Sequence, residues 1–270
     1  MLRKLLLYPL LLLLLLIAGL DAWGYLTLGK LQPQADPQRN PYANRVVLVM
    51  GATGSVGDGL LEAALEDPDV ARVIVITRRS SPRIEAGVAS GKLTKLLHED
   101  FTDYAGYDAL LAQTNTVLWG LGTTSIGMDD ATYTRIHVDF PMAFIRAWLD
   151  ARQEAPMAFH FVTGMGTDPE GSQHWAREKG RTEREMAAAA AGTGLRTFSY
   201  RSGFVRPTSD QANPGHHILE WLLRPGKLVV TATELGQAML EISKRTAELP
   251  NGTLIDNGDT IAYARAYAEP

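Results

Sequence analysis

The stretch that decides the fold is Gly51-Ala52-Thr53-Gly54-Ser55-Val56-Gly57. An apolar run typical of a β-strand, Val46 to Met50, comes before it, and an amphipathic segment, Asp58 to Glu66, follows it. Strand, glycine turn and helix in this order are the context in which such a motif binds a dinucleotide. The three glycines permit a tight turn, a close approach of the backbone to a pyrophosphate, and close packing of the helix on the strand. The competing interpretation is a structural glycine turn in an α/β domain that binds no ligand.

The amides at the start of the expected helix, together with the positive end of its dipole, form a binding site for phosphate groups. The spacing Gly-x-x-Gly-x-x-Gly, rather than Gly-x-Gly-x-x-Gly, is typical of the short-chain dehydrogenases. The residues predicted to contact the phosphates are Gly51, Thr53, Gly54, Ser55, Val56 and Gly57.

Two arginines follow the second β-like run, Val73 to Thr77. An acidic residue at this place accepts the ribose hydroxyls of NAD, whereas arginine suits the 2′-phosphate of NADP. The forked guanidinium matches the geometry of a phosphate. Arg78 and Arg79 therefore predict NADP, with NADPH preferred over NADH. The alternative is a pair of solvated arginines at a strand end.

Strand-like and helix-like runs alternate along the chain, which predicts a doubly wound parallel α/β sheet of the Rossmann type. Further strands are expected at 93–98, 116–121, 157–163 and 195–201, and helices at 108–113, at 129–153 and in the alanine-rich stretch that Gly192 ends. The carboxyl ends of such strands line a ligand crevice. Asp100 and Phe101 are predicted neighbours of an adenine, or else simple loop-capping residues. Leu121, Gly122 and Thr123 leave room for a ribose and a nicotinamide.

The pattern changes from about residue 208. A helix at 216–223, a strand at 227–232, a helix at 234–245, a strand at 253–255 and a helix at 260–268 are expected. We interpret this tail as a small cap that covers the substrate and belongs to the same domain. The predicted organisation is an anchor over residues 1–28, a linker over 29–44 rich in Pro, Gln and Asn, and a nucleotide-binding domain over 45–270.

The N-terminus differs from the rest of the chain. Arg3 and Lys4 precede a leucine-rich run from Leu5 to Leu20, and aromatic residues suited to a membrane interface follow. This pattern predicts an uncleaved membrane anchor, with a cleaved signal peptide as the alternative. The need for a soluble cofactor favours a cytoplasmic domain, whereas the basic start favours the opposite orientation.

Composition and missing motifs exclude several classes of function. The net charge of −4, with 26 basic and 30 acidic residues, predicts no nucleic-acid partner. The chain has no cysteine, which removes disulfides, thiolate nucleophiles and cysteine-ligated metals. His216-His217 lacks the spacing of a zinc site, so no metal is expected. Neither a phosphate-loop lysine motif nor the Gly-x-Ser-x-Gly elbow of a serine hydrolase is present.

Taken together, these motifs resemble the atypical short-chain dehydrogenase/reductase superfamily. More closely, the chain looks like the Tat-interacting-protein-like branch of NADP-binding proteins, over roughly residue 45 to the C-terminus. The residues that carry the resemblance are the glycine loop, Thr77-Arg78-Arg79, Asp100-Phe101, Leu121-Gly122-Thr123-Thr124, Thr163-Gly164-Met165-Gly166, Lys179-Gly180 and the stretch 201–207, which includes Ser202 and Gly203. The resemblance implies a nicotinamide dinucleotide held by these residues, and a small carbonyl-type substrate.

The resemblance also implies a catalytic set in which Thr163 orients a carbonyl, and Lys179 binds the nicotinamide ribose and activates a tyrosine four residues before it. That position holds Trp175, whose indole cannot act as a proton-transfer acid near neutral pH. Three accounts are open. Another acid, such as His174, Tyr133 or Tyr200, takes over; or water or a cofactor hydroxyl does so; or the protein binds NADP(H) without turnover, as a sensor or scaffold at a membrane. Whether the chain is an NADP-dependent oxidoreductase is therefore left open by the sequence.

Overall fold

The computed structural model describes residues 2–152 and 154–269. Met1, Gln153 and Pro270 lie outside the described residues. They are the first residue of the predicted anchor, the last residue of the predicted helix 129–153 and the last residue of the predicted domain.

Within the described residues, seven strands form one parallel sheet in the order β3-β2-β1-β4-β5-β6-β9. The strands are β1 (Val46–Met50), β2 (Arg72–Thr77), β3 (Leu93–Leu97), β4 (Thr116–Trp119), β5 (Met157–Val162), β6 (Leu195–Arg201) and β9 (Thr253–Asp256). The two short strands β7 (Phe204–Arg206) and β8 (Val229–Thr231) pair with each other outside this sheet. The predicted doubly wound parallel sheet is confirmed.

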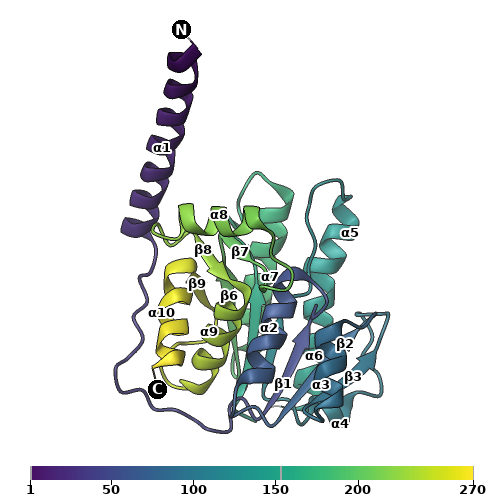
Figure 1. Ribbon diagram of the computed structural model, residues 1–270. Helices are drawn as coiled ribbons and strands as arrows, with labels where there is room; N and C mark the ends of the chain where they lie inside the picture. The colour runs from purple at the N-terminus through teal and green to yellow at the C-terminus, as the bar shows by residue number, and fades with distance from the viewer. Residues whose placement is uncertain (1, 153, 270) are drawn as a thin grey trace.

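Helices cover both faces of the sheet and give a three-layer domain (Figure 1). The helices are α1 (Leu2–Thr27), α2 (Ser55–Glu66), α3 (Pro82–Ala89), α4 (Asp108–Leu111), α5 (Asp130–Thr134), the π-helix η1 (Arg135–Asp139), α6 (Phe140–Ala151), α7 (His174–Ala190), α8 (Pro214–Leu223), α9 (Ala232–Lys244) and α10 (Asn257–Ala268).

The sheet separates two hydrophobic cores. Side chains of β1 alternate between them, because successive residues of a strand point to opposite faces. Val47 and Val49 pack with α2, α9 and α10, whereas Leu48 and Met50 pack with α6 and α7. All four are fully buried. Burial on both faces explains why β1 is a continuous apolar run and not an alternating one.

The expected long helix over 129–153 is broken into α5, η1 and α6. The break is a π-helical turn over Arg135–Asp139, followed by Pro141 in the first turn of α6. Proline has no amide hydrogen to donate within a helix, so it favours a new helix start at this point. Helix α3 was not expected from the sequence, although Ser81 caps it and Pro82 occupies its first position.

The C-terminal tail is only in part a cap. Strand β9 pairs with β6 and extends the main sheet, and α9 packs on α2 through a face that includes Leu235, Met239 and Ile242. The segment that lies beyond the carboxyl edge consists of β7, β8 and α8 (Figure 1). The apolar face of α9 therefore belongs to the hydrophobic core and not to the predicted cap.

Apart from its C-terminal end, helix α1 stands away from the domain (Figure 1), and residues 11–16 within it are exposed leucines. In the part of the chain that the structure describes, no helix combines the length and the apolar content needed to cross a membrane. The predicted membrane anchor over residues 1–28 is therefore not supported.

The segment predicted as a linker, residues 29–44, is extended and runs along the C-terminal helices. The amide of Gly29 donates to Asp256, that of Leu31 donates to Asp259, and the guanidinium of Arg39 pairs with Glu241. These contacts fix where α1 leaves the domain.

Candidate functional site

A crevice lies at the carboxyl edge of the sheet, where the strand order reverses between β1 and β4. Ligands bind at this switch point in open α/β sheets. The crevice consists of two adjoining hollows of about 540 Å³ and 400 Å³, which share Gly54, Gly120, Leu121 and Gly122. We call them the arginine half and the lysine half after the charged residues that line them.

The glycine loop forms the wall between the two halves. Gly51 has φ of +76°, and a Cβ on it would lie 2.5 Å from the amide nitrogen of Leu121. A Cβ on Gly57 would lie 2.0 Å from the carbonyl oxygen of Gly51, so Gly57 packs beneath the loop and does not line the crevice. Helix α2 starts at Ser55, which leaves its first amides without acceptors inside the helix. A pyrophosphate fits this cradle.

The arginine half is lined by Thr53, Arg78, Arg79 and Phe101. The Nε atom of Arg79 donates to the hydroxyl of Thr53 over 3.4 Å. Among the described side chains, neither arginine forms an ion pair. Their charge is therefore available to an anion.

Asp100 is not in the crevice. Its exposed carboxylate accepts hydrogen bonds from the amide and hydroxyl of Thr102 and lies 3.6 Å from the guanidinium of Arg135. These contacts fit the alternative in which Asp100 only caps its loop. Phe101, by contrast, lines the crevice, although its side chain is only 3% exposed.

The lysine half contains most of the remaining predicted residues. Its walls include Ser55, Val56, Leu121, Gly122, Thr123, Thr163, Lys179, Ser202 and Gly203. The hydroxyl of Ser202 is buried and has no hydrogen-bond partner among the described residues. Because an unpaired buried hydroxyl is costly, it is suited to pairing with a bound polar group.

Lys179 and Thr163 meet in this half, but through the backbone of Thr163. The Nζ atom of Lys179 donates to the Thr163 carbonyl oxygen over 3.0 Å. The Thr163 hydroxyl donates into the interior, to Glu183 at 3.0 Å and to the Tyr200 carbonyl oxygen at 3.1 Å. Loss of solvation lowers the pKa of Lys179 to about 8, although the negative charge of Glu183 raises it in part.

Trp175 lies outside the crevice. Its ring is 3.9 Å from a Cβ built on Gly164 and 3.5 Å from one built on Gly166, so it covers the loop after β5. It is not among the residues that line either half. The space beside Thr163 and Lys179 is therefore open.

The three alternative acids do not line the crevice either. The ring of His174 lies near the hydroxyl of Thr134 and the main chain of Asp130. Burial raises the pKa of Tyr133 to about 12. Tyr200 is fully buried, and its hydroxyl lies 2.8 Å from Nδ1 of His160. Each of these three side chains is therefore hydrogen-bonded or buried away from the crevice.

One lining residue, His137, was missed by the sequence reasoning. It lies on η1, its Nε2 atom is 3.1 Å from the carbonyl oxygen of Thr123, and a Cβ on Gly122 would lie 2.9 Å from its ring. Burial, and then the charge of Lys179, lowers its pKa to about 3, so the ring is neutral. Single π-helical turns occur often at functional sites, but nothing in the sequence marked this turn.

The fold is similar to that of solved structures. RhlG of Pseudomonas aeruginosa in an active-site complex with NADP has a TM-score of 0.60 over 83% of this chain and 99% of that chain, at 16% identity. The L-sorbose reductase of Gluconobacter frateurii, complexed with NADPH and L-sorbose, has a TM-score of 0.59 over 79% and 94%, at 11% identity. The fold is the Rossmann fold of the short-chain dehydrogenases and reductases. At these identities the likeness shows the fold alone.

Curated relatives are more similar in sequence. The protein fmp52 of Aspergillus clavatus is 27% identical over 180 residues, which are 65% of this chain and 73% of that protein. The protein fmp52-1 of Aspergillus terreus is 29% identical over 171 residues, or 62% and 70%. Both are named mitochondrial proteins. No protein-family model matches the chain. The closer resemblance to the Tat-interacting-protein-like branch is not supported by these relatives.

Proposed function

We propose that the protein is an NADP(H)-dependent oxidoreductase of the short-chain dehydrogenase/reductase type that acts on a small carbonyl compound. The observation that carries the proposal is one continuous crevice with an amide-lined glycine loop at its centre, two unpaired arginines at one end and Lys179 at the other. Two neighbours in fold, RhlG complexed with NADP and the L-sorbose reductase complexed with NADPH, support it.

The preference for NADP rests on the arginine half. Two guanidinium groups without carboxylate partners among the described residues suit a 2′-phosphate, which carries the charge that NADH lacks. Arg79 is held near the glycine loop through Thr53, and Arg78 lines the same half, so these two arginines would hold the 2′-phosphate.

The proton for the reaction comes from Lys179 in this proposal. When bound, NADPH supplies the hydride that reduces the carbonyl carbon. The carbonyl oxygen takes a proton from the Lys179 ammonium, and the resulting amine regains a proton from water. A pKa of about 8 suits this exchange near neutral pH. Thr163 is less suited to donate to the carbonyl, since its one hydroxyl hydrogen is already shared between Glu183 and the Tyr200 carbonyl oxygen.

The alternative, a cofactor sensor or scaffold without turnover, is not favoured. Such a protein would be expected to fill the space beside Thr163 and Lys179 with Trp175, whereas Trp175 covers Gly164 and Gly166.

Titration with NADPH and with NADH, followed by nicotinamide fluorescence, tests the cofactor assignment. The double variant Arg78→Ala/Arg79→Ala is measured beside the parent protein, and Arg146→Ala, an exposed helix arginine outside the crevice, serves as the control. We expect NADPH to bind at least about tenfold more tightly than NADH, and the double variant to lose this preference. Equal binding of both nucleotides by parent and double variant would contradict the NADP assignment, and no binding would contradict the proposal as a whole.

A further inference from the structure

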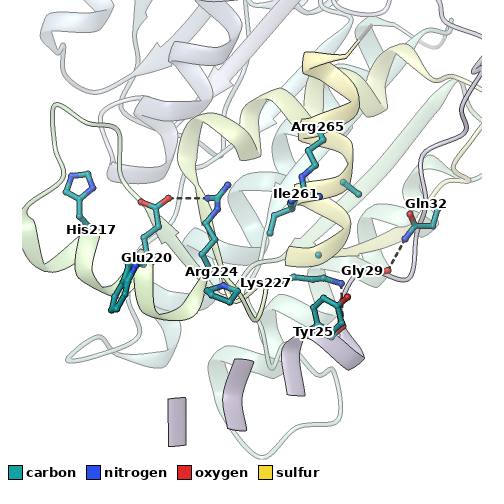
Figure 2. Close-up of a pocket in the computed structure, with 13 residues that line it drawn as sticks. Tyr25, Gly29, Gln32, His217, Glu220, Arg224, Lys227, Ile261 and Arg265 are labelled. Carbon is teal, nitrogen blue, oxygen red and sulfur yellow. Dashed lines mark hydrogen bonds and ion pairs between the residues drawn. The ribbon is translucent and has the colours of Figure 1, made fainter. Parts of the chain in front are cut away.

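A second cleft lies away from the crevice, where the end of α1 meets α8 and α10 (Figure 2). Its volume is about 810 Å³, larger than either half of the crevice. Ligand sites of small molecules commonly have volumes of roughly 300–1,000 Å³. No residue predicted to bind the nucleotide lines this cleft, so it is a separate site.

One wall of the cleft is an apolar helix with little to cover it. None of the residues of α8 is buried, although the helix carries Ile218 and Trp221, which are 60% and 76% exposed. Trp221 lines the cleft, and Ile261 of α10 lies across from α8 (Figure 2). Ile218 lies outside the cleft, and Ile261 is only 8% exposed, so Trp221 supplies most of the exposed apolar surface. Exposed apolar surface of this kind is typical of a binding site. The cleft therefore suits a ligand with an apolar body.

The charged groups of the cleft are mostly basic. Arg224, Lys227 and Arg265 line it, and Glu220 is the only acid among the described lining residues. Arg224 is compensated, because it pairs with Glu220 and Glu234. Arg265, which reaches into the cleft from the α10 side in Figure 2, has no ion pair among the described side chains.

Lys227 is the second uncompensated charge. Its Nζ atom donates to the carbonyl oxygens of Leu28 and Tyr25, at 2.9 Å and 3.4 Å, and lies 5.0 Å from the centre of the Tyr25 ring. Among the described residues, it is the only non-glycine residue with a backbone in the left-handed region, with φ of 58°. Glycine would adopt this conformation without strain. A lysine in such a place points to a role for its side chain.

The cleft is fixed by the docking of the two ends of the chain. The amide of Gly226 donates to Asp21 over 3.0 Å, and that of Gly29 donates to Asp256 over the same distance. The backbones of Gly29 and Gly258 are in contact, because a Cβ on Gly258 would lie 2.4 Å from the Gly29 nitrogen. A ligand would therefore meet a preformed site, which lowers the cost of binding.

We propose that this cleft binds an amphiphile with one hydrocarbon chain and an anionic headgroup such as a phosphate monoester. The headgroup lies between Arg265 and Lys227, and the chain lies along Trp221 and Ile261. Guanidinium and ammonium groups both pair with phosphate oxygens. The ligand is either a free amphiphile or a lipid at the surface of a bilayer, since the two present the same chemistry. The proposal does not depend on nucleotide binding in the crevice.

The test uses the full chain and dodecyl phosphate below the concentration at which it forms micelles, with calorimetric titration as the readout. The variants are Arg265→Gln/Lys227→Gly, in which the glycine suits the left-handed backbone, and Trp221→Ala. Arg146→Gln, an exposed helix arginine outside the cleft, is the control. Circular dichroism and the midpoint of thermal unfolding show that each variant is folded.

We expect dodecyl phosphate to bind the parent and the control equally, and both cleft variants at least about tenfold more weakly. Inorganic phosphate should bind weakly, because it lacks the chain. A second arm uses phosphatidylcholine vesicles with and without lysophosphatidic acid, which has one chain and a phosphate monoester. If the parent binds anionic vesicles more tightly than neutral ones, and the Arg265→Gln/Lys227→Gly variant does not, the ligand is a bilayer lipid. If the parent binds only the soluble probe, the ligand is a free amphiphile. Binding that the cleft variants leave unchanged, or no binding of either probe, would overturn the proposal.

Discussion

The ammonium of Lys179 lies 3.0 Å from the main-chain carbonyl oxygen of Thr163, while the side chain of the same threonine points to the interior. The two residues thus form one wall of the crevice, but only the lysine offers it a proton donor. The hydroxyl of Thr163 is held by Glu183, which in turn pairs with Arg201. This arrangement favours a reaction in which the lysine is the acid.

The rate of carbonyl reduction should therefore depend on the protonation of Lys179. Because the ammonium is the active form and its pKa is about 8, kcat/KM with NADPH should be level at lower pH and fall by about tenfold per pH unit above pH 8. The measurement is a pH profile with phenanthrenequinone and short aldehydes as carbonyl probes. Lys179→Arg keeps the charge but does not release its proton in this range, so this variant should be slower by about 10²-fold or more and lose the fall above pH 8. An unchanged profile in Lys179→Arg would show that another group is the acid.

The glycine loop offers a matched pair of substitutions. Gly51 and Gly91 both have positive φ, at +76° and +78°, so alanine at either costs about 1–2 kcal/mol of backbone strain. At Gly91 the new Cβ meets open space, whereas at Gly51 it would lie 2.5 Å from the Leu121 nitrogen. Gly51→Ala should therefore lower the free energy of unfolding by about 1–3 kcal/mol more than Gly91→Ala, and should abolish NADPH binding. Urea unfolding and nucleotide titration measure the two effects, and equal behaviour of the two variants would contradict the packing described for the loop.

Trp175 should be dispensable for nucleotide binding. Its ring covers the loop after β5 and does not line the crevice, so Trp175→Phe should change the Kd for NADPH by less than about twofold. A sensor whose crevice is filled by the indole would behave differently, because the smaller ring would open the site and tighten binding.

Tyr200 should affect stability and not catalysis. Its hydroxyl lies 2.8 Å from Nδ1 of His160, whose Nε2 atom lies 2.7 Å from the hydroxyl of Ser243, and the three side chains are buried. Tyr200→Phe leaves a buried imidazole nitrogen unpaired and should lower the free energy of unfolding by about 1–3 kcal/mol. Tyr42→Phe, at a side chain that is 61% exposed, should change it by less than about 0.5 kcal/mol. Loss of NADPH binding in the folded Tyr200→Phe protein would contradict a structural role.

The sequence predicted those parts of the fold that depend on local pattern. The ranges 46–50 and 195–201 match β1 and β6 to the residue. Strand β1 is a short, continuous apolar run with clear ends, as is typical of a buried parallel strand. The crevice followed from the same reasoning, since the carboxyl ends of parallel strands meet at one edge. Placement of Gly51 and Arg79 around it needed only the strand ends and the glycine motif, whereas Lys179 was assigned from the family resemblance.

What the sequence could not predict depends on contacts between distant segments. The direction of the Thr163 hydroxyl is decided by Glu183, twenty positions along the chain, and by the backbone of the neighbouring strand. The π-helical turn that carries His137 has no local signal, because its sequence also fits an ordinary amphipathic helix. The cleft beside Lys227 is formed by the two ends of the chain, which a reading in sequence order keeps apart.

We infer that the crevice at the carboxyl edge binds NADP(H). Hydrogen–deuterium exchange of the full chain with and without saturating NADPH tests it most directly, because it reports where the nucleotide lies. We expect slower exchange in peptides that cover 51–57, 120–124 and 163–166, and no change in the segment 214–227, which lines the second cleft. Protection confined to 214–227, or none in the glycine loop while NADPH is bound, would contradict it.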